Sequence, residues 1–158
     1  MTGSADGHAA AAADDLARRC AEAMWAGDVA SRELGMKIEH VSSGCSTVSM
    51  TVRPDMTNGH GTVHGGLIFA LADSAFAFAC NSHNERAVAQ ACDIVFSAPA
   101  STGDRLVATA TERHRFGRNG IYDVRVTCGE LVIAEFRGRS RSIGGTLVAD
   151  ATEAGHRD

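Results

Sequence analysis

The sequence predicts an α+β fold in which one curved antiparallel β-sheet wraps a single buried helix. Three observations favour it: an apolar helical segment at residues 67–81, a β-hairpin pattern before it, and four strand-like segments after it. A buried helix must be covered, and the flanking strands can supply a sheet that does so. One sheet still leaves part of the helix and a sheet edge uncovered, so we also expect a dimer.

Two elements are expected before the buried helix, an amphipathic helix and a β-hairpin. Over residues 14–26 the apolar side chains recur at helical spacing, and the first two residues are aspartates, which favour the start of a helix. Residues 36–41, the turn at residues 42–44 and the alternation of apolar side chains over residues 48–52 are typical of a hairpin. Pro54 should end the second strand.

The central segment, residues 67–81 (LIFALADSAFAFACN), is too long and too rich in alanine for a strand. Its apolar side chains occupy the full helical circumference, which predicts burial. Residues 57–66 (TNGHGTVHGG) form a shaped loop before it, because Gly and Asn tolerate crowded or left-handed backbone. Four β-rich segments follow, separated by glycine-containing turns, and predict an antiparallel meander; they are residues 88–96, 105–115, 121–127 and 131–142.

The composition fits one globular domain and excludes several classes of partner. The chain has 158 residues, so we expect a single domain over residues 14–148 between flexible ends at residues 1–13 and 149–158. A net charge of −4 gives no basic field for nucleic acid. We expect no membrane partner and a cytoplasmic protein, because no leader pattern and no run of spanning length is present. Five cysteines without metal-finger spacing are expected to be free thiols.

Asp73 is the strongest candidate for a catalytic residue. It is the only charged residue in the central helix, and its helical neighbours are Phe69, Ala70, Phe76 and Ala77. A buried carboxylate is costly, so Asp73 is either a structural acid held by hydrogen bonds or a functional acid with a raised pKa. We favour the functional role, since an alanine would fill a purely structural position more easily.

Gly65 and Gly66 stand where the loop meets this helix. The first N–H groups of a helix lack intrahelical acceptors, so glycine here would let a substrate carbonyl reach bare backbone donors. The alternative is that both glycines only permit a tight turn. Eight residues separate Gly65 from Asp73, about 12 Å of helix, so one chain cannot bring both to the same carbonyl. Two antiparallel helices across a two-fold axis would bring Gly65 of one chain to Asp73 of the other.

The loop before the helix offers further polar candidates. Asn58 could orient water or a carbonyl through its amide, although Asn58-Gly59 is also a turn dipeptide. His60 and His64 have a metal-like spacing but no evident third ligand, so no metal site is expected. His64 should instead pack or hydrogen-bond at the helix entrance.

Arg137, Arg139 and Arg141 alternate along the last predicted strand, so their guanidinium groups should share one face. Most such charges belong to a solvated strand face. Three arginines together on an acidic protein nevertheless suit phosphate groups, and the nucleotide of coenzyme A (CoA) is one ligand that would use them.

Four segments carry a resemblance to a known family: TNGHGTVHGGLIFALADSAFAFACNS, CDIVFSAPASTGDRL, GRNGIYDVRV and AEFRGRSRSIGG. They resemble the hotdog thioesterase family, in particular its phenylacetic acid degradation branch, over residues 35–147. The resemblance implies a hotdog fold and hydrolysis of aryl- or hydroxyaryl-acetyl-CoA in the cytoplasm. It also implies that the enzyme needs no cofactor and is a homotetramer of two dimers.

The resemblance assigns roles to individual residues. It makes Asp73 the catalytic acid, Gly65 the backbone oxyanion donor and Asn58 the polar loop residue. Related thioesterases carry a helping hydroxyl one turn beyond the acid, where this chain has Ala77, and Ser74 is the only hydroxyl nearby. We therefore expect Ser74, His64 and Gly66 at the substrate with the three arginines.

Two other functions compete with hydrolysis. A hotdog hydratase or dehydratase uses an acid and a histidine, and Asp55 and His60 imitate that spacing. A non-catalytic acyl-CoA-binding module would not require a buried aspartate. Only hydrolysis releases CoA with a free thiol, so a thiol reagent distinguishes the three.

Overall fold

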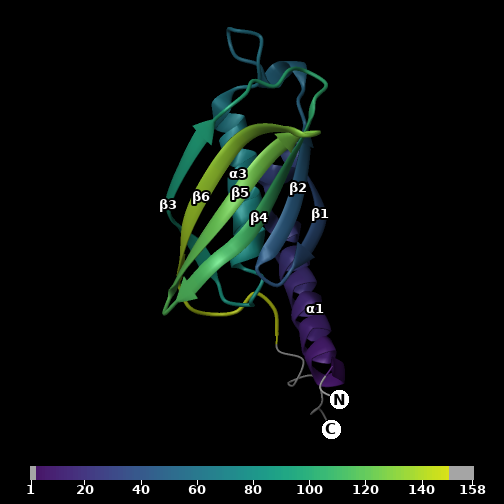
Figure 1. The fold of residues 1–158 in the computed structure, drawn as a ribbon, viewed down its shortest axis with the longest axis vertical. Helices are drawn as coiled ribbons and strands as arrows, with labels where there is room; N and C mark the ends of the chain where they lie inside the picture. Colours follow the sequence, from purple (N-terminus) through teal and green to yellow (C-terminus); the bar gives the residue numbers. More distant parts are fainter. Residues whose placement is uncertain (1–2, 150–158) are drawn as a thin grey trace.

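The computed structural model describes residues 3–149 as one six-stranded antiparallel sheet with a long helix lying along one face (Figure 1). The elements are α1 (Gly3–Gly27), α2 (Val29–Glu33), β1 (Lys37–Ser42), β2 (Cys45–Thr51), the short 3-10 helix η1 (Pro54–Met56), α3 (Gly65–Cys80), β3 (Ala87–Phe96), β4 (Arg105–Phe116), β5 (Asn119–Cys128) and β6 (Leu131–Ser142). The predicted hairpin, central helix and four later strands are all present.

The strand order is β1-β2-β4-β5-β6-β3, and every neighbouring pair is antiparallel. Strands β4, β5 and β6 form the predicted meander, but β3 pairs with β6 instead of β4. Asn81 helps to place β3, because its amide donates to the carbonyls of Ala77 and Ala87 and accepts from the Ala87 N–H. This fixes the start of β3 beside the end of α3, and β3 becomes an edge of the sheet.

The core lies between α3 and the inner face of the sheet. Phe76 and Phe78 of α3 are buried, as are Leu106, Val124 and Val126 of the facing strands. Burying a side chain of this size contributes roughly 1.5–3 kcal/mol.

One position in β6 shows how closely helix and sheet approach. A Cβ atom at Gly138 would lie 2.7 Å from the ring of Phe76, so only glycine lets α3 lie against β6 at this point.

One side of α3 is not covered within the chain. Phe69, Asp73 and Ala77 are spaced four residues apart, so they lie along one side of the helix, and all three are only half-buried. The helix is therefore buried on its sheet side, and this stripe is the part that one sheet was expected to leave uncovered.

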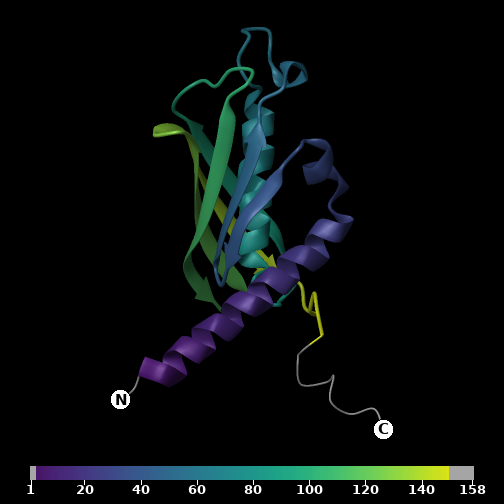
Figure 2. The same cartoon turned by 90° about the vertical axis from the view of Figure 1, so that its right-hand side faces the viewer.

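Helix α1 begins at Gly3, well before residue 14, where the sequence analysis began it. Residues 9–13 are all alanine, the residue with the highest helix propensity, so the helix extends through them. Helix α1 crosses beside β1 and α3 (Figure 2), where Trp25 contacts Phe78 with ring centroids 6.2 Å apart. The predicted C-terminal tail lies outside the described residues from residue 150 onward.

The two sheet edges differ in character. Strand β1 is short, has a bulge between Ile38 and His40, and exposes the charged side chain of Lys37. Strand β3 has ten residues and exposes Val95 and Phe96, at 66% and 49%. Within residues 3–149, no helix is both long enough and apolar enough to cross a membrane.

Candidate active site

Asp73 lies in the middle of α3, on the side of the helix that its own sheet leaves open. Within residues 3–149 its carboxylate has neither a hydrogen-bond nor an ion-pair partner, and burial raises its pKa. Burial and, after it, the charge of Asp73 raise the pKa of Cys80 to about 12. The same two causes raise the pKa of Cys92. A half-buried carboxylate without a partner can act as a base or a nucleophile.

The start of α3 offers one free backbone donor. His64 caps the helix, since its Nδ1 accepts a hydrogen bond of 2.9 Å from the Gly66 N–H. The His64 carbonyl accepts from the N–H groups of Leu67 and Ile68. This leaves the Gly65 N–H, which has no acceptor among the described residues. The predicted role of His64 at the helix entrance is confirmed, and only Gly65 of the glycine pair can donate to a substrate carbonyl without displacing His64.

A pocket of about 350 Å³ opens beside Gly65. The Phe96 ring lies over the glycine, so that a Cβ atom at Gly65 would come within 3.1 Å of Phe96 Cζ. Val63 and Ile68 complete an apolar wall, and Thr62 stands at the rim of the pocket. An acyl or pantetheine chain fits such a surface better than a charged group does. No local sequence signal points to Phe96, because its proximity to Gly65 depends on the path of β3.

The Asn58 amide shapes the loop that leads to α3. Its Oδ1 accepts from the N–H groups of His60 and Thr62 at 2.9 and 3.3 Å, and its Nδ2 donates to Thr62 Oγ1 at 3.2 Å. These contacts are those of a turn residue, the alternative that the sequence left open. They hold the loop that precedes Gly65 in shape.

Ser74 does not extend the arrangement around Asp73. Its hydroxyl lies 2.9 Å from that of Ser31 on α2. Consecutive helical residues point about 100° apart, so Ser74 lies on a different side of α3 from Asp73. Its expected role at the substrate gains no support from these contacts.

The three arginines of β6 lie on the outer face of the sheet, opposite α3. Arg137 forms two hydrogen bonds with the Asp123 carboxylate, at 2.6 and 2.9 Å, and Arg139 contacts Asp93 at 3.0 Å. Arg141 has no such partner within the described residues. Two of the three positive charges are thus already balanced, and none of them faces Asp73 of its own chain.

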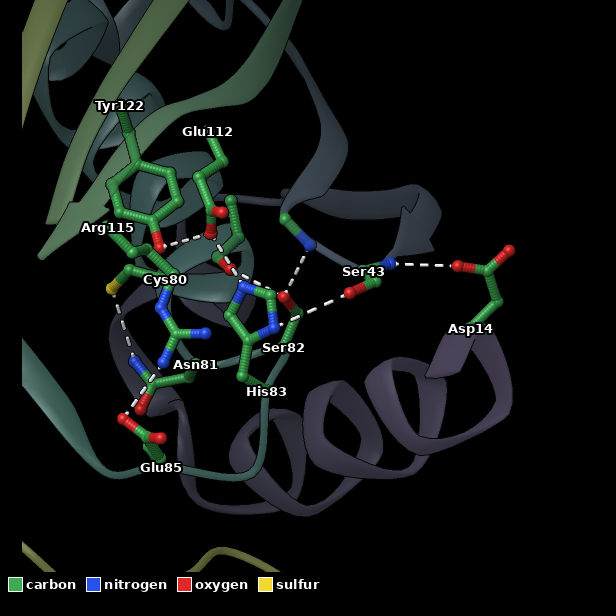
Figure 3. Close-up of polar contacts among 12 residues, drawn as sticks. Asp14, Ser43, Cys80, Asn81, Ser82, His83, Glu85, Glu112, Arg115 and Tyr122 are labelled. Carbon is green, nitrogen blue, oxygen red and sulfur yellow. Dashed lines mark hydrogen bonds and ion pairs between the residues drawn. The ribbon is translucent and has the colours of Figure 1, made fainter. Parts of the chain in front are cut away.

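A polar network that the sequence analysis did not identify holds the far end of α3 (Figure 3). The Glu112 Oε2 atom accepts from the Tyr122 hydroxyl at 2.8 Å and lies 2.6 Å from His83 Nε2. The Ser82 hydroxyl accepts from the Gly44 N–H at 2.7 Å. These contacts join α3 to the first hairpin and to β4 and β5, and so fix the helix that carries Asp73.

The residues of the competing hydratase hypothesis do not form an acid–histidine pair. The Arg53 guanidinium donates two hydrogen bonds to Asp55, at 3.0 and 3.2 Å, and holds the pKa of that carboxyl below its ordinary value. His60 is exposed on the loop. Among the described residues, no group of three or more His, Cys, Asp or Glu side chains could hold a metal ion.

Comparison with known proteins identifies the family. The thioesterase superfamily model matches residues 60–134. The chain is 46% identical over 132 residues to the acyl-coenzyme A thioesterase PaaI of Escherichia coli strain K12, covering 83% of this chain and 94% of that protein. It is 44% identical over 108 residues to a putative esterase of Deinococcus radiodurans, covering 66% and 73%.

Solved structures agree with this relationship. The structure of the E. coli PaaI protein from the phenylacetic acid degradation operon superposes with a TM-score of 0.83 at 44% identity, covering 84% of this chain and 97% of that one. The TT0310 protein of Thermus thermophilus gives a TM-score of 0.70 at 38% identity, covering 72% and 96%. These comparisons show that the chain belongs to the thioesterase superfamily and is a thioester hydrolase. Its sheet wrapped around a central helix is the hotdog fold of that family.

Proposed function

We propose that this hydrolase cleaves aryl- or hydroxyaryl-acetyl-CoA to the free acid and CoA. The observation that carries the proposal is the partnerless, half-buried Asp73 on the same helix as the free Gly65 N–H. The substrate class rests on similarity, because one relative is named acyl-coenzyme A thioesterase PaaI and its structure is linked to the phenylacetic acid degradation operon.

The chemistry assigns one task to each group. The Gly65 N–H donates to the thioester oxygen and stabilises the negative charge that develops there. Asp73 either removes a proton from water as the water attacks, or attacks the carbonyl itself to give an anhydride that water then opens. In both routes the carbon–sulfur bond breaks and CoA leaves as a thiolate. No cofactor is needed for either route. Asn58 contributes by holding the loop that presents Gly65.

Each active site is proposed to be shared between two chains. The 12 Å or so between Gly65 and Asp73 along α3 is too long for both to reach one carbonyl in the same chain. The start of α3 lies against the end of the unpaired edge strand β3, with Gly65 beside Phe96, so a second copy could cover the open stripe and this edge together. The resemblance to the phenylacetic acid degradation branch extends this to a homotetramer of two such dimers.

The CoA nucleotide is proposed to bind the arginines of β6. Arg141 is available without any rearrangement, whereas Arg137 and Arg139 would have to exchange Asp123 and Asp93 for phosphate. We place the reaction in the cytoplasm, a reducing compartment, because all five cysteines are free thiols. Nucleic acid and membrane are not proposed as partners.

Substrate class is tested by mixing the protein with phenylacetyl-CoA, hydroxyphenylacetyl-CoA and straight-chain acyl-CoA in the presence of a thiol reagent. We expect release of CoA thiol with the highest kcat/KM for the aryl-acetyl substrates. A hydratase or a binding module would release none. Release that is faster for straight-chain substrates would overturn the proposed substrate class while leaving thioester hydrolysis intact.

The shared site is tested by complementation. Asp73→Ala and Gly65→Pro should each be nearly inactive alone. When both are unfolded together and refolded, half the dimers are mixed, and each mixed dimer has one site with an intact Gly65 facing an intact Asp73. Activity should recover to about a quarter of wild type from this random pairing. If mixed dimers form but stay inactive, the shared site is wrong.

A further inference from the structure

Helix α3 and strand β3 run side by side in opposite directions, and two contacts fix their alignment. Gly65 lies against Phe96. Phe69 packs on Phe136, with ring centroids 5.3 Å apart, and Phe136 is the ladder partner of Ile94. Burial and, to a lesser extent, the charge of Asp73 raise the pKa of Cys92, which agrees with this alignment. Residues 65 and 69 of the helix thus lie level with residues 96 and 94 of the strand, and at the ordinary rise of each element residue 73 comes level with residue 92.

Along this alignment, four residues of the helix cover nearly the same length as two residues of the strand. Four helical residues rise about 6 Å, and two strand residues rise about 6.8 Å. The spacing from Gly65 to Asp73 therefore matches the spacing from Phe96 to Cys92. A symmetry axis placed midway along the helix is also midway along the strand.

The position of that axis follows from the shared site proposed above, on which this inference rests. If Gly65 of one chain faces Asp73 of the other across two antiparallel helices, the midpoint is Phe69 in both chains. The corresponding midpoint on β3 is Ile94. Phe69 and Ile94 are level with each other through Phe136, so one axis serves the paired helices and the paired edge strands together.

We propose that the Phe69 rings of the two chains meet at this axis, form an aromatic wall between the two active sites, and select aryl-acyl substrates. Phe69 lies one helical turn from Asp73 on the same side of α3, and it is half-buried. Its ring is held edge-on by Phe136 at an interplanar angle of 71°, and Phe136 in turn contacts Phe76 at 5.9 Å. The wall is therefore fixed in orientation before any substrate binds.

The chemistry of the substrate fits this position. In an arylacetyl thioester one methylene separates the ring from the carbonyl carbon, so the ring lies within about one helical turn of the attacked atom. Aromatic pairs gain attraction beyond simple area burial, which a straight alkyl chain on the same wall would not have. Phe69 is thus a specificity-determining residue rather than a chemical participant.

The position of the axis is tested by cross-linking. Phe69→Cys should give a covalent dimer with mild oxidant or a short bismaleimide, joined through residue 69 of both chains by peptide mapping. Ala77→Cys is the matched control, because it lies on the same stripe but about 12 Å further from the axis and should not cross-link to its counterpart. Wild type reports the background of the native cysteines. Cross-linking through residue 77 but not through residue 69 would show that the two Phe69 rings do not meet at the axis.

The selective role is tested with Phe69→Leu, compared with Phe116→Leu at a half-exposed ring on the far turn of β4. The ratio of kcat/KM for phenylacetyl-CoA to that for hexanoyl-CoA should fall about tenfold in Phe69→Leu, the scale of one aromatic pair, and stay unchanged in Phe116→Leu. An unchanged ratio in a dimeric Phe69→Leu would overturn the aryl role. If Phe69→Cys nevertheless cross-links through residue 69, the position of the axis and the shared site would still be supported. If the wild-type protein released no CoA from either substrate, the proposed function itself would be refuted.

Discussion

The proposed oxyanion role of Gly65 can be tested by two substitutions, only one of which keeps the backbone N–H group. Gly65→Pro removes the donor, and Gly65→Ala keeps it. Both introduce a Cβ atom 3.1 Å from Phe96 Cζ, so both demand the same small shift of a half-exposed ring. Gly65→Ala therefore controls for the Cβ atom, and the remaining difference in rate reports the loss of the N–H together with the closure of the proline ring.

The backbone at this junction accepts proline. Gly65 is the first residue of α3, where the N–H has no intrahelical acceptor and proline is well tolerated. His64 has φ −65° and ψ 130°, within the extended region that a residue before proline requires. The His64 cap bonds to the Gly66 N–H, which neither substitution removes. We expect both variants to fold and to dimerise like wild type.

Removal of one oxyanion donor typically lowers kcat by about 10²–10³, which is roughly 2.7–4 kcal/mol of transition-state stabilisation. Gly65→Pro should show a loss of this size relative to Gly65→Ala, and Gly65→Ala should stay within about tenfold of wild type, the usual effect of a small steric shift. Steady-state release of CoA thiol at saturating substrate measures kcat, and thermal unfolding checks the fold. Equal kcat for the two well-folded variants would refute an oxyanion role for Gly65.

Other predictions address the acid, the arginines and the polar network. Asp73→Asn should lower kcat by at least about 10²-fold. Because burial raises the pKa of Asp73, its ionised form destabilises the folded protein above that pKa. The Tm of Asp73→Asn at pH 8 should therefore be no lower than that of wild type. In wild type, kcat/KM should fall on acidification at a pH above the ordinary aspartate value of about 3.9, and a fall only at or below that value would argue against a desolvated base. Arg139→Ala should raise KM for CoA thioesters more than for pantetheine thioesters. The control is Arg125→Ala, which removes an arginine paired with Glu135 on the same face and should not show this difference. Equal effects of Arg139→Ala on both substrates would mean that the arginines do not bind the CoA nucleotide. Tyr122→Phe should lower the free energy of unfolding by about 1–2 kcal/mol and Tm by about 2–8 °C, and a loss below about 0.5 kcal/mol in urea titrations would contradict the importance of its bond to Glu112.

The elements of this fold were predictable because each depends on a local pattern. The apolar circumference of α3 and the alternation in the first hairpin each involve residues that are close together in the chain. The pairing of β3 with β6 was not predictable in this way, since it is set by contacts between distant segments and by the Asn81 side chain. The early start of α1 was missed because the alanines before residue 14 have no amphipathic pattern.

The candidate site was likewise predictable only where a residue stands out from its local sequence. Asp73 stands out as one charge in an apolar helix, and Gly65 as a glycine at a loop–helix junction. The choice between the two glycines depends on the His64 side chain, which local sequence does not orient. The acidic partners of Arg137 and Arg139 come from other strands, so a stripe that seems free in sequence is largely paired in space.

The unlike edges of the sheet have a consequence for how copies of this chain can accumulate. A subunit with two receptive edges could add neighbours at both ends and grow without limit. Here β1 is short, bulged and charged, and only β3 offers a long apolar edge. If two copies pair through β3, as the proposed dimer requires, neither has a second such edge among its described residues, so growth through strand pairing would stop at two and give a closed particle rather than a fibre.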